Sequence, residues 1–224
     1  MIEMPVAAMV LWGMIVGLDL ASMLQGMINR PLVAGAVAGV LLNDPAAGLR
    51  IGVTLELFAL DVLPVGASRY PDYGAATVAA VALAAGQSWI VALGPSVLLG
   101  LVLAQLGGVS VVLHRRVAAW ALARHQEALD RGDPGVASTI HLLGLSADIL
   151  RSAALAAFGL GCAVLLARHG PRLDVATGRA LAIVVVAGGF VAVIGGALRR
   201  AGTARRIAWL AGGVGLGVLG LALR

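Results

Sequence analysis

Residues 29–72 read NRPLVAGAVAGVLLNDPAAGLRIGVTLELFALDVLPVGASRYPD, and this stretch decides the fold. Proline, glycine and charged residues divide it into apolar runs at 32–42, 50–63 and, just beyond it, 73–85. Each run is shorter than the roughly 20 residues that a helix needs to cross a bilayer core. Irregular backbone at membrane depth is tolerated where it is buried in protein or lines a wet cavity. The stretch therefore predicts two re-entrant helical hairpins, with breaks at 43–45 and 64–72.

The composition identifies the surroundings of these hairpins as a membrane. Of the 224 residues, 60% are hydrophobic and 12% are charged, and the mean hydropathy is +0.99. In a soluble domain about a quarter of the residues are charged. The apolar residues form long blocks and do not alternate with polar ones, which favours helices over barrel strands. We therefore expect an all-α, polytopic integral membrane protein.

About four conventional spans follow the interrupted region, at residues 89–113, 140–167, 180–198 and 207–223. We accordingly divide the chain at residue 85. Residues 1–85 form the interrupted helical region with the candidate site, and residues 86–224 form transmembrane helices with an amphipathic loop at 114–137. This loop is predicted to be helical and to lie along the membrane interface, as a solvated connector or, alternatively, as a docking surface.

The formal charge of +5 comes from arginine alone, because the chain contains no lysine. The arginines gather in the connections between apolar blocks, which membrane topology explains better than nucleic-acid binding. The loops at 114–137 and 199–206 contain more arginine than the connection at 168–179. The positive-inside rule therefore places these two loops in the cytoplasm. The first apolar block lacks the features of a cleaved signal peptide, so we expect it to be retained.

Polar side chains concentrate in the interrupted region. Each would be costly in hydrocarbon unless it is paired or faces water, so their concentration predicts a polar site. A neutral, hydroxyl-rich solute suits such a site, and a pair between Glu56 and Arg30 would keep the empty site neutral. Arg30 and Asp44 can equally be interpreted as caps of helix ends. The candidate binding residues are Asp19, Gln25, Asn29, Arg30, Glu56, Asp61, Ser68 and Asp72.

Other chemistry finds little support in the sequence. Asp148 and Arg151 stand at i,i+3 within the span at 140–167 and could simply pair with each other. The histidines lack metal-ligand spacing, and the single cysteine, Cys162, excludes a disulfide within the chain. We find no phosphate-binding glycine loop and no catalytic Ser/His/Asp arrangement that shares one side of the membrane. We therefore expect no metal, no cofactor and no catalytic residue.

Five motifs, in order, resemble the IIC subunit of the mannose/fructose/sorbose family of bacterial phosphotransferase systems. They are NRPLVAG at 29–35, LLND at 41–44, GLRIGVTLEL at 48–57, PVGA at 64–67 and YPD at 70–72. The resemblance continues more loosely to residue 151. Three departures from the family pattern fall in the same region, at Asn43, at Asp61 and at Arg69-Tyr70, and they could reshape the site.

The resemblance implies a sugar permease subunit in the bacterial cytoplasmic (inner) membrane. Such a subunit binds a hexose-like sugar, and its expected partners are a IID membrane subunit, soluble IIA and IIB phosphocarriers, the sugar and membrane lipid, with no nucleic acid. A homotrimer within a IIC–IID complex is expected. The phosphate would be delivered by IIB, so this chain would hold only the sugar. Carried onto this chain, Glu56 and Asp72 are the best sugar-site candidates, followed by Gln25 and Asn29.

Two other functions fit the same residues. A regulatory or scaffold membrane protein derived from the family would bind a sugar or a partner without conducting anything. A standalone secondary transporter would use Glu56 or Asp61 as a proton-coupling carboxylate.

Overall fold

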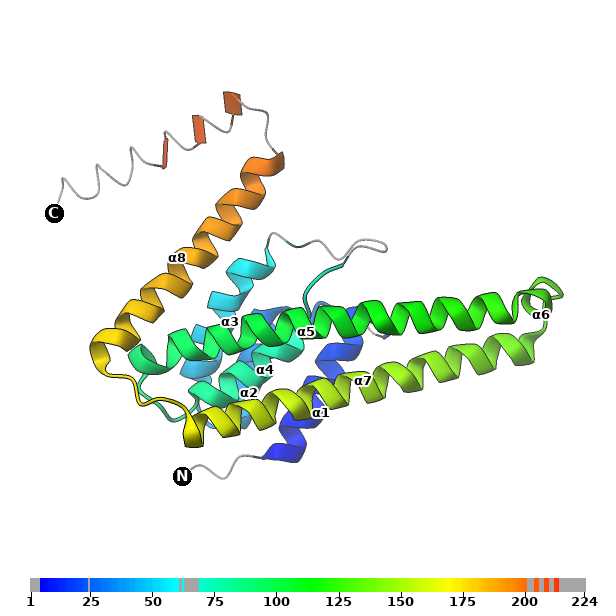
Figure 1. The fold of residues 1–224 in the computed structure, drawn as a ribbon, viewed down its shortest axis with the longest axis horizontal. Helices are drawn as coiled ribbons and strands as arrows, with labels where there is room; N and C mark the ends of the chain where they lie inside the picture. The colour runs from blue at the N-terminus through cyan, green and yellow to red at the C-terminus, as the bar shows by residue number, and fades with distance from the viewer. Residues whose placement is uncertain are drawn as a thin grey trace.

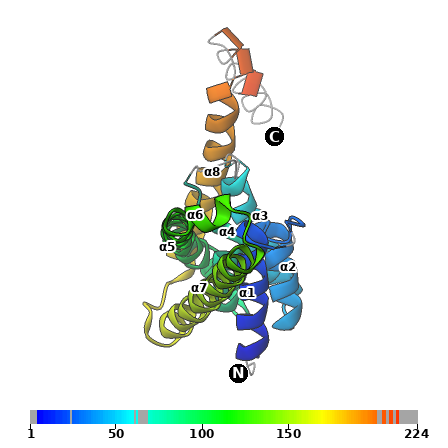
Figure 2. The same cartoon turned by 90° about the vertical axis from the view of Figure 1, so that its right-hand side faces the viewer.

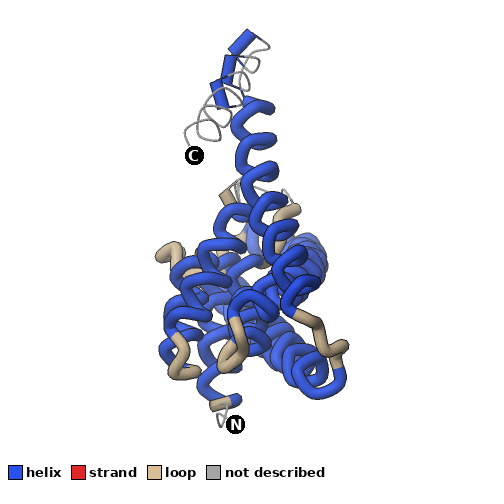
Figure 3. Tube along the Cα trace, turned by 90° about the vertical axis from the view of Figure 1, so that its left-hand side faces the viewer, coloured by secondary structure: helices blue, strands red, loops and turns tan. Residues whose placement is uncertain are grey.

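The computed structural model describes residues 5–23, 25–60, 62, 69–200, 204–205, 208–209 and 212–213, and these residues contain helices and no strand (Figure 3). The all-α prediction is confirmed for this part of the chain. Asp61, Ser68 and nearly all of the span predicted at 207–223 lie outside the described residues. The helices are α1 (Val6–Ala21), α2 (Pro31–Leu41), α3 (Pro45–Ala59), α4 (Tyr73–Ala84), α5 (Trp89–Arg124), α6 (Gln126–Asp130), α7 (Pro134–His169) and α8 (Val175–Arg200).

Three of the described helices are long and apolar enough to cross a membrane, namely α5, α7 and the Val175–Gly196 part of α8. They overlap the spans predicted at 89–113, 140–167 and 180–198. In contrast, α1, α2 and α4 are shorter apolar helices. The described helices before residue 85 are thus shorter than the three spans that follow.

The helices α5 and α7 extend further than the sequence predicted. Each contains 36 residues, which is about 54 Å of helix against a bilayer core of roughly 30 Å. Residues 114–124 were predicted as part of a separate interfacial helix, but they are the last turns of α5. The arginines there end the apolar run, yet no glycine or proline between residues 109 and 131 interrupts the helix. The fall in hydropathy after residue 113 therefore indicates where the membrane ends, whereas α5 continues to Arg124.

The outer halves of α5 and α7 run side by side to α6 and project beyond the other helices (Figure 1). We call this projecting hairpin, residues 114–147, the arm. Viewed from the side of the arm, α8 rises away from the remaining helices (Figure 2). Most side chains of the arm are exposed.

The short helix α4 lies at the centre of the molecule. Nearly every residue from Gly74 to Ala84 is buried, and α4 contacts α1, α2, α3, α5 and α7. Its sequence consists mainly of alanine, valine and glycine, so neighbouring helices approach its backbone closely. A helix that is apolar on every side and only 12 residues long is stable here because protein surrounds it.

The helices α2 and α3 pack against each other through glycines. Gly35 and Gly39 of α2 face Gly48 and Gly52 of α3, and a Cβ atom at Gly48 would lie 2.3 Å from the Gly35 carbonyl oxygen. Small residues at Gly35 and Gly39 let the backbones of the two short helices approach each other closely. The matching glycines of α3, spaced four apart in the same way, complete the contact.

The turn between α2 and α3 has its own signals. Asn43 adopts a φ of +55°, a left-handed conformation that asparagine tolerates better than most residues. The Asp44 side chain accepts a hydrogen bond from the backbone N–H of Ala47 at 3.0 Å, so the interpretation of Asp44 as a helix cap is confirmed. Its second oxygen accepts from the N–H of Gly86 at 3.0 Å. This bond ties the turn to the connection that precedes α5.

Candidate functional site

Two helix ends and two helix beginnings meet at one end of the short helices. The helices α1 and α3 end there, and α2 and α4 begin there. Arg30, just before α2, contacts Glu56 near the end of α3. The carbonyl oxygen of the preceding residue, Asn29, lies against α4, because a Cβ atom at Gly74 would approach it to 2.3 Å. The predicted site residues of the first 60 positions and the start of α4 therefore share one end of the fold.

Glu56 is held by two partners. Arg30 donates from Nε to Oε1 at 2.7 Å, and the backbone N–H of Leu32 donates to Oε2 at 3.1 Å. The first N–H groups of a helix lack partners within the helix, so this carboxylate also stabilises the start of α2. The side chains of Arg30 and Glu56 are 28% and 18% exposed, so solvent reaches both. The predicted pair between Glu56 and Arg30 is confirmed as a contact.

Asp19 organises the loop between α1 and α2. It is buried, and it accepts hydrogen bonds from the N–H groups of Gly26 at 2.6 Å and Asn29 at 3.0 Å. Gln25 lies in this loop, is exposed and has a φ of +47°. Both oxygens of Asp19 are thus occupied by the backbone of the loop. Asp19 shapes the segment that presents Gln25 and Asn29.

Asp72 is fully buried at the start of α4. Its Oδ1 accepts from the N–H of Ala75 at 3.2 Å and caps the helix, while its own N–H donates to the carbonyl of Ala104 on α5 at 2.9 Å. Its Oδ2 lies 3.5 Å from Nη1 of Arg151 and accepts no hydrogen bond from the described residues. Asp72 therefore lies beneath the surface in this structure, whereas Glu56 borders solvent.

Arg151 belongs to a buried polar cluster that sequence reasoning did not connect with Asp72. Its Nε donates to Oδ1 of Asp148 at 2.6 Å, which confirms the predicted i,i+3 pair. The fully buried Asp148 also accepts from the hydroxyl of Ser22. Arg151 also donates hydrogen bonds to the hydroxyls of Ser110 on α5 and Ser152 on α7. A further hydrogen bond goes to the carbonyl oxygen of Gly17 on α1.

The signal for this cluster was present in the sequence, as two charged residues inside an apolar span. Spacing along one helix revealed their contact with each other but not with Asp72, because Asp72 lies far away in the chain. From the sequence alone, the pair of Asp148 and Arg151 could be purely structural. The structure shows that it connects four helices, α1, α4, α5 and α7.

The segment that precedes Asp72 is anchored to α5 by Tyr70. The Tyr70 ring is buried, its centroid lies 4.8 Å from the guanidinium carbon of Arg115, and Arg115 donates a hydrogen bond to its hydroxyl. The Tyr70 carbonyl lies so close to α5 that a Cβ atom at Gly108 would approach it to 2.5 Å. Tyr70, which departs from the family pattern, is thus held in place by Arg115.

The two ends of the group of short helices, α1 to α4, contact different positions along α5. Ala104, which accepts from Asp72, lies about 22 Å along the helix from Trp89 at 1.5 Å per residue. The opposite end, at the turn of Asp44, is bound to Gly86 immediately before α5. The end that holds Glu56 and Asp72 therefore faces toward the arm.

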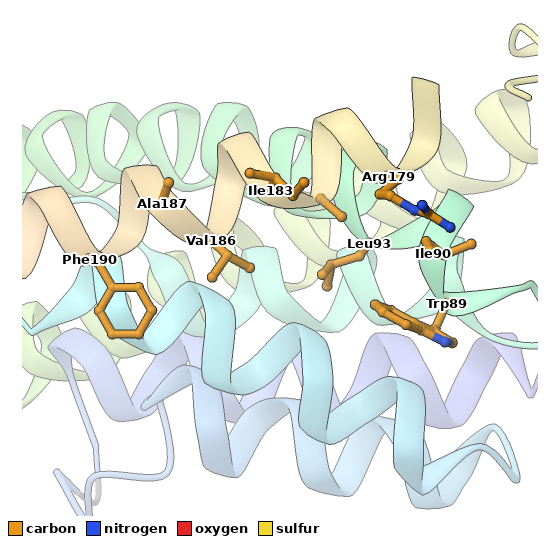
Figure 4. A pocket seen from close by; sticks show the side chains of 9 residues that line it. Trp89, Ile90, Leu93, Arg179, Ile183, Val186, Ala187 and Phe190 are labelled. Atoms are coloured by element: carbon orange, nitrogen blue, oxygen red, sulfur yellow. The ribbon is translucent and has the colours of Figure 1, made fainter. Parts of the chain in front are cut away.

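A separate groove lies between α5 and α8, and it has a volume of about 410 Å³ (Figure 4). None of the predicted site residues lines it. Among the described residues, no three histidine, cysteine, aspartate or glutamate side chains gather in a way that could hold a metal ion. The candidate site is thus the polar end around Glu56, with the buried cluster behind it.

Comparison with known proteins gives matches of three kinds. Residues 4–206 match the family model described as the PTS system sorbose-specific IIC component. The mannose-specific EIIC component of Escherichia coli (strain K12) is 32% identical over 126 residues, which are 56% of this chain and 46% of that protein. The sorbose-specific EIIC component of Lacticaseibacillus casei is 32% identical over 122 residues, which are 54% of this chain and 41% of that protein. The matched region thus spans less than half the length of these relatives.

A solved structure shares the fold over nearly the whole chain. It is the cryo-EM structure of the mannose transporter ManYZ in complex with microcin E492. The TM-score is 0.60 at 24% identity, and the alignment covers 97% of this chain and 92% of the other. At this identity the likeness concerns the arrangement of the helices.

Proposed function

The chain belongs to the family of sorbose-specific IIC components of phosphotransferase systems and is an inner-membrane protein, and we propose that it is the sugar-permease subunit of such a system. In this role it binds a hexose-like sugar and moves it across the membrane, where a partner IIB phosphorylates it. The observation that carries this proposal is the family match over residues 4–206. The polar end with Glu56 and the breaks around it fall within the matched region.

In this proposal the sugar binds beside Glu56 and Arg30. A sugar hydroxyl both donates and accepts hydrogen bonds, so a carboxylate next to a guanidinium offers it both kinds of partner. The pair is partly exposed and needs no countercharge when the site is empty. Asn29 and Gln25, in the loop shaped by Asp19, would contribute amide contacts from the adjacent side.

Asp72 is proposed as the deeper member of the same site. Its Oδ2 accepts no hydrogen bond from the described residues, and a buried carboxylate oxygen without a hydrogen bond favours a new donor. A sugar hydroxyl would reach it in a state where the start of α4 has moved from Arg151. Asp61 and Ser68 remain predicted members of the site from the sequence alone.

We also propose that the α2–α3 pair and the α3–α4 pair are re-entrant hairpins. The 11 residues of α2 span about 16 Å, roughly half of the bilayer core. Helices of this length that begin at a substrate site recur in transporters that work by alternating access, in which one bundle moves against another. The short helices α1–α4 would then move relative to the long helices, and the cluster around Arg151 would be the contact between them.

The position of the site suggests where the sugar meets its phosphate donor. The end with Glu56 faces the arm, and the positive-inside rule predicts that the arm lies in the cytoplasm. A sugar held there would be accessible to a soluble IIB. We propose a IID membrane subunit, IIA and IIB as partners, and a homotrimer of this chain within the IIC–IID complex.

An uptake experiment with defined components tests this function. The chain is expressed with IID, IIA and IIB from a mannose-type gene cluster, in cells that lack their own systems of this type, and accumulation of labelled sugar phosphate is measured. The proposal predicts accumulation only when all four proteins are present. Uptake of free sugar without IIB would indicate a secondary transporter and contradict the proposal. Sugar binding without any uptake would indicate a regulatory or scaffold protein and would also contradict it.

A further inference from the structure

The groove between α5 and α8 continues toward α3. The part in Figure 4 is lined by apolar side chains of α5 and α8 together with Arg179. A second hollow of about 660 Å³ adjoins it and adds residues of α3, including Arg50 and Val53. The two hollows share Trp89, Leu93, Val186 and Phe190. They therefore form one apolar groove with walls from three helices, which we call the α3–α5–α8 groove.

This groove forms because α8 crosses closely over the first turns of α5. A Cβ atom at Gly178 would lie 2.7 Å from the Cα of Val91, and one at Gly94 would lie 2.5 Å from the Cβ of Leu181. The contact through small residues fixes α8 near the beginning of α5. Further along, Gly189 of α8 meets the side chain of Leu57 on α3. The groove lies on the outer side of these contacts, where Ile183 and Phe190 are exposed.

One end of the groove is positively charged. Arg179 of α8 lies at the same end as Trp89 (Figure 4), and the guanidinium carbon of Arg50 lies 5.8 Å from the centroid of the Trp89 ring. Both arginines are exposed, and no carboxylate is among the described residues that line the groove. Tryptophan favours the headgroup level of a bilayer. Arginine is the side chain best suited to a phosphate group.

The length of the groove fits one leaflet. From Arg179 to Phe190 the helix α8 rises about 16 Å, and half of a hydrocarbon core of roughly 30 Å is about 15 Å. A molecule with a phosphate at Arg179 would therefore place an alkyl chain along the hollow as far as Phe190. The C-terminal residues 201–224 contain no aspartate or glutamate. They offer no countercharge for the two arginines.

We propose that the α3–α5–α8 groove binds an anionic phospholipid, with its phosphate between Arg50 and Arg179 and one acyl chain along α8. The anionic headgroup supplies the negative charge that the lining lacks. Its acyl chain fills the apolar hollow between α3, α5 and α8. Glu56 lines neither hollow, so lipid binding and sugar binding are separate properties of the chain.

Native mass spectrometry of the full chain in an uncharged detergent tests this site. Phosphatidylglycerol and phosphatidylcholine with identical acyl chains are added in turn, and the fraction of protein that retains one lipid is measured. We expect preferential retention of phosphatidylglycerol. Removing both charges, with Arg50→Gln and Arg179→Gln, should weaken the affinity for phosphatidylglycerol about thirtyfold, since each arginine near an anionic surface contributes about 1 kcal/mol.

Two further variants separate this proposal from general effects. Arg168→Gln with Arg172→Gln removes the same charge from the nearby α7–α8 connection and should leave the preference unchanged. Ala187→Trp, at an exposed position of α8 in the groove, should reduce retention of both lipids while thermal unfolding stays as in the parent chain. Equal retention of the two lipids by the parent chain would overturn the proposal. Displacement by inorganic phosphate, with no effect of Ala187→Trp, would indicate a phosphate site and would also overturn it.

Discussion

The guanidinium of Arg151, on α7, lies 3.5 Å from the buried carboxylate of Asp72 at the start of α4. The same guanidinium also forms an ion pair with Asp148, with Nε of Arg151 2.6 Å from Oδ1 of Asp148. One cation therefore lies beside two carboxyl groups that are both fully buried. Because Asp72 belongs to the interrupted region and Arg151 to a conventional span, their contact connects the two parts of the chain.

Replacing Arg151 should destabilise the protein strongly. Arg151→Met would leave Asp72 and Asp148 buried without their cation, and breaking a buried ion pair typically costs about 3–5 kcal/mol. Thermal and denaturant unfolding in detergent measures this loss. Arg116→Met, at an exposed position of the arm, should change stability by less than about 0.5 kcal/mol. Adding Asp72→Asn and Asp148→Asn to Arg151→Met should recover part of the loss, and equal stability of the two arginine variants would contradict the assignment.

The contact between α2 and α3 should not tolerate a single methyl group. A Cβ atom at Gly48 would lie 2.3 Å from the Gly35 carbonyl oxygen, so Gly48→Ala should separate the helices and lower the free energy of unfolding by about 1–3 kcal/mol. Gly144→Ala is the matched control, because no atom lies within 4 Å of a Cβ atom there. That variant should be neutral or slightly stabilising, since alanine favours a helix by up to about 1 kcal/mol. Similar unfolding of both variants would contradict the close packing.

The arm and the α7–α8 connection should lie on opposite sides of the membrane. With Cys162→Ser as background, a cysteine at Gln126 in α6 should react with a membrane-impermeant reagent only in inverted vesicles. A cysteine at Arg172 should react only in intact cells or spheroplasts. Both positions are exposed, so the access depends on topology. The reverse pattern would place the arm outside the cytoplasm and contradict the positive-inside prediction.

The second break should be more accessible to water than the helix before it. A cysteine at Ser68, in the predicted break at 64–72, should be labelled by a small aqueous reagent faster than one at Leu57 on α3. The rates are compared in the same vesicles and normalised to labelling in detergent. Equal protection of the two positions would argue for an ordinary span in place of a re-entrant hairpin.

The sequence predicted α2 and α4 well because their ends have local signals, whereas the run predicted at 50–63 missed the first turn of α3 (Pro45–Ala59). The run predicted at 32–42 is α2 (Pro31–Leu41), since Pro31 begins the helix and Asp44 caps the next one. The pair of Glu56 and Arg30 was also predicted, from two opposite charges in the same apolar region. By contrast, the end predicted at residue 113 for the helix that is α5 (Trp89–Arg124) was wrong. Arginines end an apolar run, but they do not end a helix.

The contacts that sequence reasoning missed are all distant in the chain. Nothing near Asp72 indicates that Arg151 lies beside it, and nothing near Tyr70 indicates Arg115. The glycines at 48 and 52 become meaningful only once α2 and α3 are known to pack together. The candidate site could therefore be predicted as a set of polar residues, but not as an exposed pair with a buried cluster behind it.

Sugar uptake by Glu56→Gln tests the central claim most directly. The variant keeps the shape of the side chain but removes the charge that pairs with Arg30 and accepts from sugar hydroxyls. Cells that contain the chain with IID, IIA and IIB should lose accumulation of sugar phosphate, with the variant inserted in the membrane at the same level as the parent chain. Glu127→Gln, at an exposed position of α6, should retain uptake. Unchanged uptake by Glu56→Gln would contradict the proposed sugar site.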